Sequence, residues 1–89
     1  MIALPLVMLH GLGITSAVFD EVRARLPAGV ETRPTELPAA PHVDEMAEQI
    51  LAAAPERFLL AGFSLGGYVA LAIMARAPSR VARLALLST

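Results

Sequence analysis

Apolar and amphipathic segments alternate along this chain of 89 residues. Each apolar run is short enough for one strand buried on both faces, and the segments between the runs repeat apolar side chains at helical spacing. Strands that alternate with helices build a parallel sheet with right-handed crossovers. The sequence therefore predicts an α/β fold, a parallel sheet of about four strands with helices on both faces. The pattern predicts strands over 2–9, 30–33, 57–63 and 81–89, and helices over 15–26, 43–54 and 65–77.

The first apolar run, 2–9, contains Pro5, which is unfavourable inside a sheet and can move the start of the strand beyond it. The run lacks the basic flank and the cleavage site of a signal peptide. It is also far shorter than the roughly 20 residues that cross a bilayer. We therefore expect a cytoplasmic protein with no membrane partner.

The composition narrows the classes of function. Hydrophobic residues make up 56% of the chain and charged residues 17%, so the sequence is more apolar than an ordinary soluble domain. The net charge of −1 provides no basic field, and we expect no nucleic-acid partner. The absence of cysteine removes disulfides, thiolate metal sites and thiol nucleophiles. All the cations are arginine, which is typical of a GC-rich bacterial genome.

The stretch AGFSLGG, residues 61–67, places Ser64 between Gly62 and Gly66. A strand that turns directly into a helix brings the two backbones together, so the flanking positions require glycine. The serine at the tip is held in a strained conformation, and the helix N-terminus favours negative charge beside its hydroxyl. This G-x-S-x-G pattern is that of a nucleophile elbow. The alternative is a glycine-rich helix start with an ordinary N-cap serine.

Three segments of the sequence, VMLHGLG, RFLLAGFSLGGYVAL and RVARLALLST, resemble the α/β-hydrolase family. The resemblance extends over essentially the whole chain and implies the N-terminal half of an α/β-hydrolase fold. It implies that Ser64 is a catalytic nucleophile and that the backbone N–H groups of Leu12 and Leu65 form an oxyanion hole. His10 and Gly11 would shape the loop after the first strand, which would face Ser64 at the switch point of the sheet.

The implied activity is hydrolysis of an ester, a thioester or a C–C bond in a small-molecule substrate, with neither cofactor nor metal. The acid and the histidine of the family's triad follow the serine in the chain. Here both histidines, His10 and His42, precede Ser64. Residues 1–89 are therefore expected to form a partial core domain that ends before the expected lid, acid and histidine, and to be inactive alone.

Other polar residues receive weaker interpretations. His10 is a candidate substitute base, because neighbouring strands lie about 4.8 Å apart. His42, Glu36 and Asp44 are expected at the surface. The loop over 36–42 echoes the D-L-P-G-H-G loop of many family members without its glycines, and no role is assigned to it.

Two alternatives to the hydrolase interpretation remain open. HGLGITS is close to the dinucleotide fingerprint G-x-G-x-x-G, with Ser16 in place of the third glycine, and Glu31 lies at the spacing of a ribose-binding acid. The other alternative is a truncated or split chain without catalysis. In the strand over 81–89, residues 84–87 are apolar on both faces, and no Lys, Pro or bulge is expected to protect this edge. The expected partner there is the missing C-terminal half or a second copy of the chain.

Overall fold

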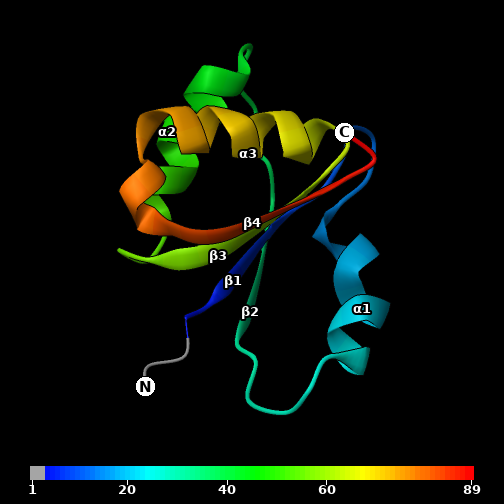
Figure 1. Cartoon of the computed structure of the whole chain (residues 1–89). Helices are drawn as coiled ribbons and strands as arrows, with labels where there is room; N and C mark the ends of the chain where they lie inside the picture. The colour runs from blue at the N-terminus through cyan, green and yellow to red at the C-terminus, as the bar shows by residue number, and fades with distance from the viewer. Residues whose placement is uncertain (1–3) are drawn as a thin grey trace.

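The computed structural model describes residues 4–89 and contains one sheet of four parallel strands, with the order β2-β1-β3-β4 (Figure 1). The predicted α/β class and the number of strands are confirmed. The first strand begins just after Pro5, and residues 2 and 3 of its predicted span lie outside the described residues. The strands are β1 (Leu6–Leu9), β2 (Thr32–Thr35), β3 (Phe58–Phe63) and β4 (Val81–Leu87).

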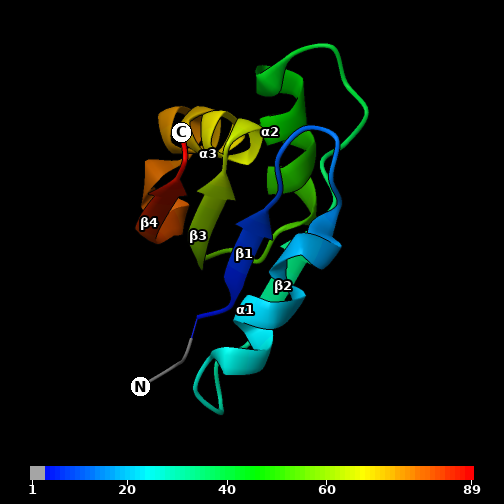
Figure 2. The same ribbon diagram turned by 90° about the vertical axis from the view of Figure 1, so that its right-hand side faces the viewer.

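Helices cover both faces of the sheet, as predicted (Figure 2). The longer helices α2 (Val43–Ala53) and α3 (Leu65–Arg76) lie on one face. On the other face lie the 3-10 turn η1 (Ser16–Phe19) and the short helix α1 (Asp20–Arg25). A second 3-10 turn, η2 (Pro78–Arg80), leads into β4.

The prediction of one continuous helix over 15–26 is wrong. Phe19 has φ −88° and ψ −2°, between the values of helix and extended chain, and the α-helix begins only after it. Its side chain is buried, whereas those of Val18 and Val22 are half exposed. The packing of Phe19 against the sheet therefore sets the backbone conformation of this segment. The regular α-helix is interrupted at this residue.

The core lies between the sheet and the pair α2 and α3. Each of its large side chains contributes about 1.5–3 kcal/mol by leaving water. Helix α3 packs against both the sheet and α2, and its apolar residues extend onto an outer side where Tyr68 and Leu71 are exposed. The largest fully buried side chains are Val7, Leu9, Phe58, Leu60, Val69 and Ile73.

Arginines tie the helical layer together at its surface. Arg76 on α3 donates hydrogen bonds to Asp44 (3.1 Å) and Glu48 (3.3 Å) on α2. Asp44 is therefore an exposed ion-pair partner, in agreement with its expected surface position. Arg80 donates to three consecutive carbonyls before β3 and lies 5.8 Å from the centre of the Phe58 ring.

The order of the strands creates one switch point, between β1 and β3. The chain leaves β1 toward β2 on one side and later returns to β3 on the other, as the family resemblance implied. Leu9 and Gly62 are register partners at the carboxyl ends of these strands. The segments that follow them, at His10 and Ser64, therefore emerge side by side, where open α/β sheets bind ligands.

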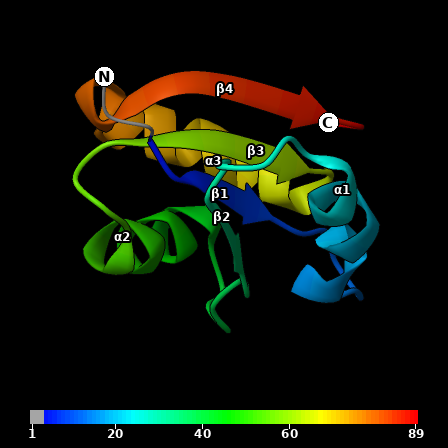
Figure 3. The same ribbon diagram turned by 90° about the horizontal axis from the view of Figure 1, so that it is seen from below.

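The outer side of β4 is an open edge within the described part of the chain (Figure 3). Phe58 pairs with Val81 and Leu59 with Arg83, so Ala82 forms an irregularity in the ladder. The sequence led us to expect no bulge in this strand, and the irregularity at Ala82 corrects that expectation. The irregularity precedes the apolar run 84–87, which remains regular. The strand ends at Leu87 rather than at residue 89, because Ser88 turns to a φ of 53°.

Candidate functional site: the serine turn between β3 and α3

Ser64 occupies the single residue between β3 and α3, with φ 55° and ψ −116°. A conformation of this kind costs a residue with a side chain about 1–3 kcal/mol. The backbone is held by two hydrogen bonds of 2.9 Å: Ser64 N–H donates to the Leu87 carbonyl, and the Ser64 carbonyl accepts from Gly67 N–H. Its hydroxyl has no hydrogen-bond partner within residues 4–89 and does not cap α3. The turn therefore presents a free hydroxyl at a helix N-terminus.

The glycines beside Ser64 permit a close contact between backbones. A Cβ atom at Gly62 would overlap the carbonyl group of Gly66. A Cβ atom at Gly66 would overlap the carbonyl oxygens of Leu9 and His10 at the end of β1. Strand β3, helix α3 and the end of β1 thus meet without intervening side chains, and this contact fixes the position of Ser64.

The loop after β1 lies directly against the turn. A Cβ atom at Gly11 would lie 3.3 Å from the Ser64 Cβ and 3.4 Å from the Phe63 carbonyl oxygen. Leu12 follows, with its side chain 84% exposed. Leu65 is the first residue of α3. Leu12 therefore follows the residue that contacts the serine turn, and Leu65 follows Ser64 itself. These are the two residues expected to supply the oxyanion donors.

His10 is buried, and both of its ring nitrogens are engaged. Nδ1 lies 2.8 Å from the Gly11 carbonyl oxygen, and Nε2 accepts the Leu37 N–H at 2.9 Å. A carbonyl can only accept and an amide N–H can only donate, so the imidazole is neutral with its proton on Nδ1. Neither nitrogen is left to take a proton from Ser64. The geometry favours a role for His10 in ordering the loop over the role of a substitute base.

Glu36 was expected to be a simple surface group, and its contacts show more. Its side chain is 59% exposed, yet Oε1 accepts the Ser16 N–H at 2.7 Å. Hydrogen bonding by Ser16, through its side chain first and its backbone N–H second, lowers the pKa of the Glu36 carboxyl below its ordinary value. Oε2 lies 3.4 Å from His10 Nε2, a contact that becomes an ion pair only when the imidazole is protonated. By contrast, His42 is exposed, as expected, and makes no side-chain cap to α2.

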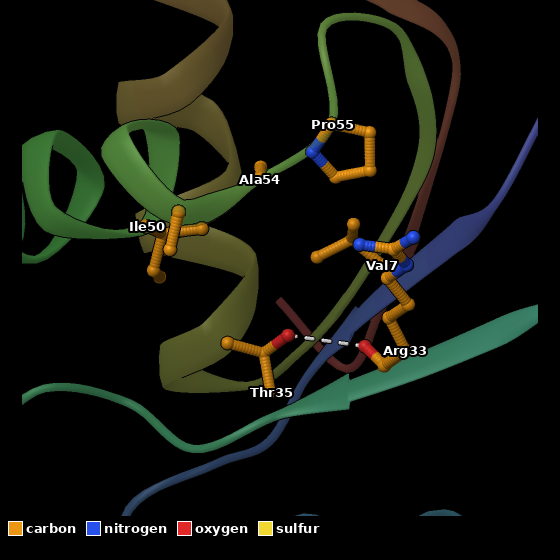
Figure 4. A pocket seen from close by; sticks show the side chains of 7 residues that line it. Val7, Arg33, Thr35, Ile50, Ala54 and Pro55 are labelled. Atoms are coloured by element: carbon orange, nitrogen blue, oxygen red, sulfur yellow. Dashed lines mark hydrogen bonds between the residues drawn. The ribbon is translucent and has the colours of Figure 1, made fainter.

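Two hollows lie near the sheet. One of about 210 Å³ lies between the sheet and the segment η1–α1, and its lining is apolar: Met8, Val18, Phe19, Val22, Phe63 and Leu87. The other, of about 60 Å³, lies between the strands and the C-terminal end of α2 (Figure 4). Thr35 lines it and donates a hydrogen bond of 3.0 Å to the Arg33 carbonyl. No residue of the serine turn lines this smaller hollow, so it is separate from the candidate site.

The described residues contain neither a cluster of metal-binding side chains nor a helix able to span a membrane. Within residues 4–89 no three His, Cys, Asp or Glu side chains gather in a way that could hold a metal ion. No helix in that range has the length and apolarity needed to cross a membrane.

Comparison with known proteins identifies the family. A sequence model of the family described as "Thioesterase domain" matches residues 4–88. A solved structure from Nostoc sp. PCC 7120, assigned to the alpha/beta hydrolases, superposes with a TM-score of 0.80 and 27% identity over 96% of this chain and 35% of its own. The chain belongs to the α/β-hydrolase family. An esterase from a marine microorganism shares the fold, with a TM-score of 0.79 and 21% identity over 97% of this α/β-hydrolase chain and 38% of its own.

Curated relatives of this α/β-hydrolase chain include two proteins named pimeloyl-[acyl-carrier protein] methyl ester esterase. The protein from Aromatoleum aromaticum is 36% identical and covers 94% of this chain and 36% of its own length. The protein from Pectobacterium carotovorum is 39% identical, with coverages of 89% and 34%. The chain therefore spans about a third of the length of these relatives.

The family explains the glycine-rich segments better than a dinucleotide site does. Glu31, the candidate ribose-binding acid, is paired with Arg33 through a contact of 2.7 Å. The glycines at 62 and 66, which a dinucleotide site leaves unexplained, shape the α/β-hydrolase serine turn. Both observations count against the dinucleotide alternative.

Proposed function

We propose that Ser64 is the nucleophile of a hydrolase that cleaves a carboxylic ester or thioester through an acyl-enzyme. The observation that carries the proposal is the conformation of Ser64, whose φ of 55° presents an unbonded hydroxyl at the N-terminus of α3. Strain of this kind persists only where the surrounding structure imposes it, and it is concentrated at active sites. The contact between Gly11 and the turn supports the same role.

The proposed chemistry begins with attack by the Ser64 Oγ on the substrate carbonyl carbon. The carbonyl oxygen gains negative charge and is held by the backbone N–H groups of Leu12 and Leu65, each contributing about 3–4 kcal/mol to the transition state. Helix α3, twelve residues long, adds the positive end of its dipole. Collapse of the tetrahedral intermediate expels the alcohol or thiol, and water then releases the acid from Ser64.

The base for these steps is proposed to come from outside the residues of this chain. Both histidines precede Ser64, and the ring nitrogens of His10 are already engaged. Without an imidazole the serine stays a neutral alcohol, aided only by the oxyanion donors. The chain alone is therefore proposed to show little or no turnover.

The proposed substrate is a small-molecule acyl ester or thioester. Support comes from the family description "Thioesterase domain" and from the methyl ester esterase name of the curated relatives. Both descriptions concern an acyl group bonded to an oxygen or sulfur leaving group. They favour these bonds over the C–C bond hydrolysis that the sequence alone also allowed.

A second candidate is a non-catalytic chain that folds by association. The open edge of β4 favours it, because unpaired strand edges are templates for another strand. The proposed partner is either a polypeptide that supplies the remaining part of the fold or a second copy joined through residues 81–89.

Chemical rescue tests the nucleophile. The chain is incubated with p-nitrophenyl acetate, with and without imidazole as an external base, and the acetylated residue is mapped by peptide mass spectrometry. We expect an adduct on Ser64 that needs imidazole and disappears in Ser64→Ala. The matched control is Ser79→Ala, which removes an exposed serine on η2 and should leave the adduct unchanged. Equal labelling of Ser79 and Ser64 would count against the proposal.

A further inference from the structure

Residues 11–14, the part of the loop that carries Leu12, have no polar side chain to hold them in place. Between Leu9 and Ser16 the chain has no regular secondary structure. Leu12 is largely exposed, and Gly13 has a φ of 77° with open space around it. An oxyanion donor needs a fixed direction, since its effect depends on geometry set before the reaction. The backbone of this loop must therefore be fixed from elsewhere.

Residues 36 and 37 bind the loop at both of its ends. At the far end, Glu36 Oε1 accepts the Ser16 N–H at 2.7 Å. At the near end, the Leu37 N–H donates to His10 Nε2 at 2.9 Å. The opposite ring nitrogen of His10 then binds the Gly11 carbonyl at 2.8 Å, one residue before Leu12. We call residues 36–37, with these contacts, the loop clamp.

The position of the clamp is set by the sheet. Thr35, the last residue of β2, is the register partner of Leu9, the last residue of β1. Glu36 and His10 are thus the first residues beyond two paired strands. Pro38 follows Leu37 and restricts it to extended conformations, which limits the freedom of the donating N–H.

We propose that Glu36 is a positioning residue that holds the Leu12 N–H in the direction an oxyanion requires. The proposal rests on the proposed function for the meaning of Leu12, whereas the clamp itself stands on the contacts above. Glu36 touches neither the nucleophile nor the substrate carbonyl in this arrangement; it acts through Ser16 and the loop. The lowered pKa of its carboxyl keeps it ionised, and a charged acceptor makes the stronger hydrogen bond.

A pH titration followed by NMR tests the clamp in the 89-residue chain. Because the Glu36 pKa is lowered in the fold, its bond to Ser16 is present above the ordinary glutamate pKa and is lost as the pH falls through the lowered value. We expect the Ser16 and Leu12 amide signals to shift with one common midpoint below that ordinary pKa. In Glu36→Gln both signals should be flat over this range. His10 is the titratable group that faces Glu36, and its ring signals are followed separately in the same experiment.

Relaxation of the amide ¹⁵N nuclei at neutral pH supplies the second measurement. Glu36→Ala should increase the mobility of residues 11–14, and Glu36→Gln, which keeps an oxygen acceptor, should do so less. Glu56→Gln is the matched control, because the Glu56 carboxylate makes no hydrogen bond or ion pair among the described residues. Unchanged mobility at Leu12 in Glu36→Ala, or a Ser16 titration that Leu12 does not follow, would overturn the proposal. If the loop loosens but Ser64 is not acylated in the rescue experiment, the clamp stands and the proposed function fails.

Discussion

At the scale of the residue, Ser64 adopts angles that are the mirror image of ordinary extended chain, a region that glycine enters freely. The surrounding backbone imposes these angles, since the Leu87 carbonyl holds its N–H and Gly67 holds its carbonyl. A side chain at this position therefore works against the stability of the fold, by about 1–3 kcal/mol. The strain at Ser64 can be measured by substitution.

Ser64→Gly is expected to be more stable than Ser64→Ala by about 1 kcal/mol. Glycine relieves the strain of the positive φ, and this gain exceeds the entropy that it adds to the unfolded chain. Alanine removes the same hydroxyl and keeps the strain, so the pair separates conformation from chemistry. Urea unfolding of the two variants provides the measurement, and equal midpoints would mean that the turn is relaxed.

Gly66→Ala should lower the free energy of unfolding by about 3 kcal/mol, because its Cβ would overlap the carbonyl oxygens of Leu9 and His10. Gly29→Ala is the comparison: Gly29 has a φ of 92° but open space around it, and conformation alone should cost about 1 kcal/mol. Urea unfolding of both variants measures the two losses in free energy of unfolding. A smaller loss at position 66 than at position 29 would contradict the close contact between β1 and α3.

The sequence predicts the conformation of a residue well when that conformation depends on close neighbours in the chain. The spacing of Gly62 and Gly66 around Ser64 is read within five positions, and the structure has the turn where the pattern predicts it. The sequence did not predict the contacts of Glu36, because its partner, Ser16, lies 20 positions away in the chain. Such a contact exists only once β1 and β2 are paired, and the partial echo of a family loop was the sole signal for it.

At the scale of the element, η1–α1 is secured by a single buried residue, Phe19. The α-helical portion has six residues, none of them buried. A helix of this length is not stable in isolation, so it depends on its contact with the sheet. The sequence predicted a longer helix because the apolar spacing was correct, but spacing cannot show that Phe19 packs inward in the middle of the segment.

Phe19→Ala is expected to reduce the free energy of unfolding by about 3 kcal/mol, since it removes the buried anchor of this segment. Val22→Ala, at a half-exposed position of the same segment, should cost about 0.5 kcal/mol. Hydrogen exchange should show early opening of residues 16–25 in the Phe19 variant. Similar costs for both substitutions would mean that the segment is held along its length and not at Phe19.

At the scale of the whole molecule, β4 has an outer edge that no other strand covers within the described residues. Residues 84–87 are apolar on both faces, and the irregularity at Ala82 lies outside this run. An edge of this kind favours pairing with another strand. We therefore expect the purified chain to self-associate when no other partner is present.

Leu86→Glu should shift the chain toward the monomer in light scattering, because a charge on this strand opposes pairing along the edge. Leu71→Glu on α3 is the control, since Leu71 is 44% exposed and Leu86 is 41% exposed. The control should leave the association unchanged if the edge is the interface. A wild-type chain that stays monomeric at high concentration would show that the edge is protected in another way.

The Leu87 carbonyl connects this edge strand to the turn, because it accepts the Ser64 N–H at 2.9 Å. Beside it, the Thr89 hydroxyl donates to the Ser64 carbonyl at 3.2 Å. A strand added beyond β4 would order the residues that hold the serine by both of its peptide groups. If a partner at this edge favours the strained turn, the partner and a reversible ligand of the serine bind cooperatively, and each raises the affinity of the other by the same factor.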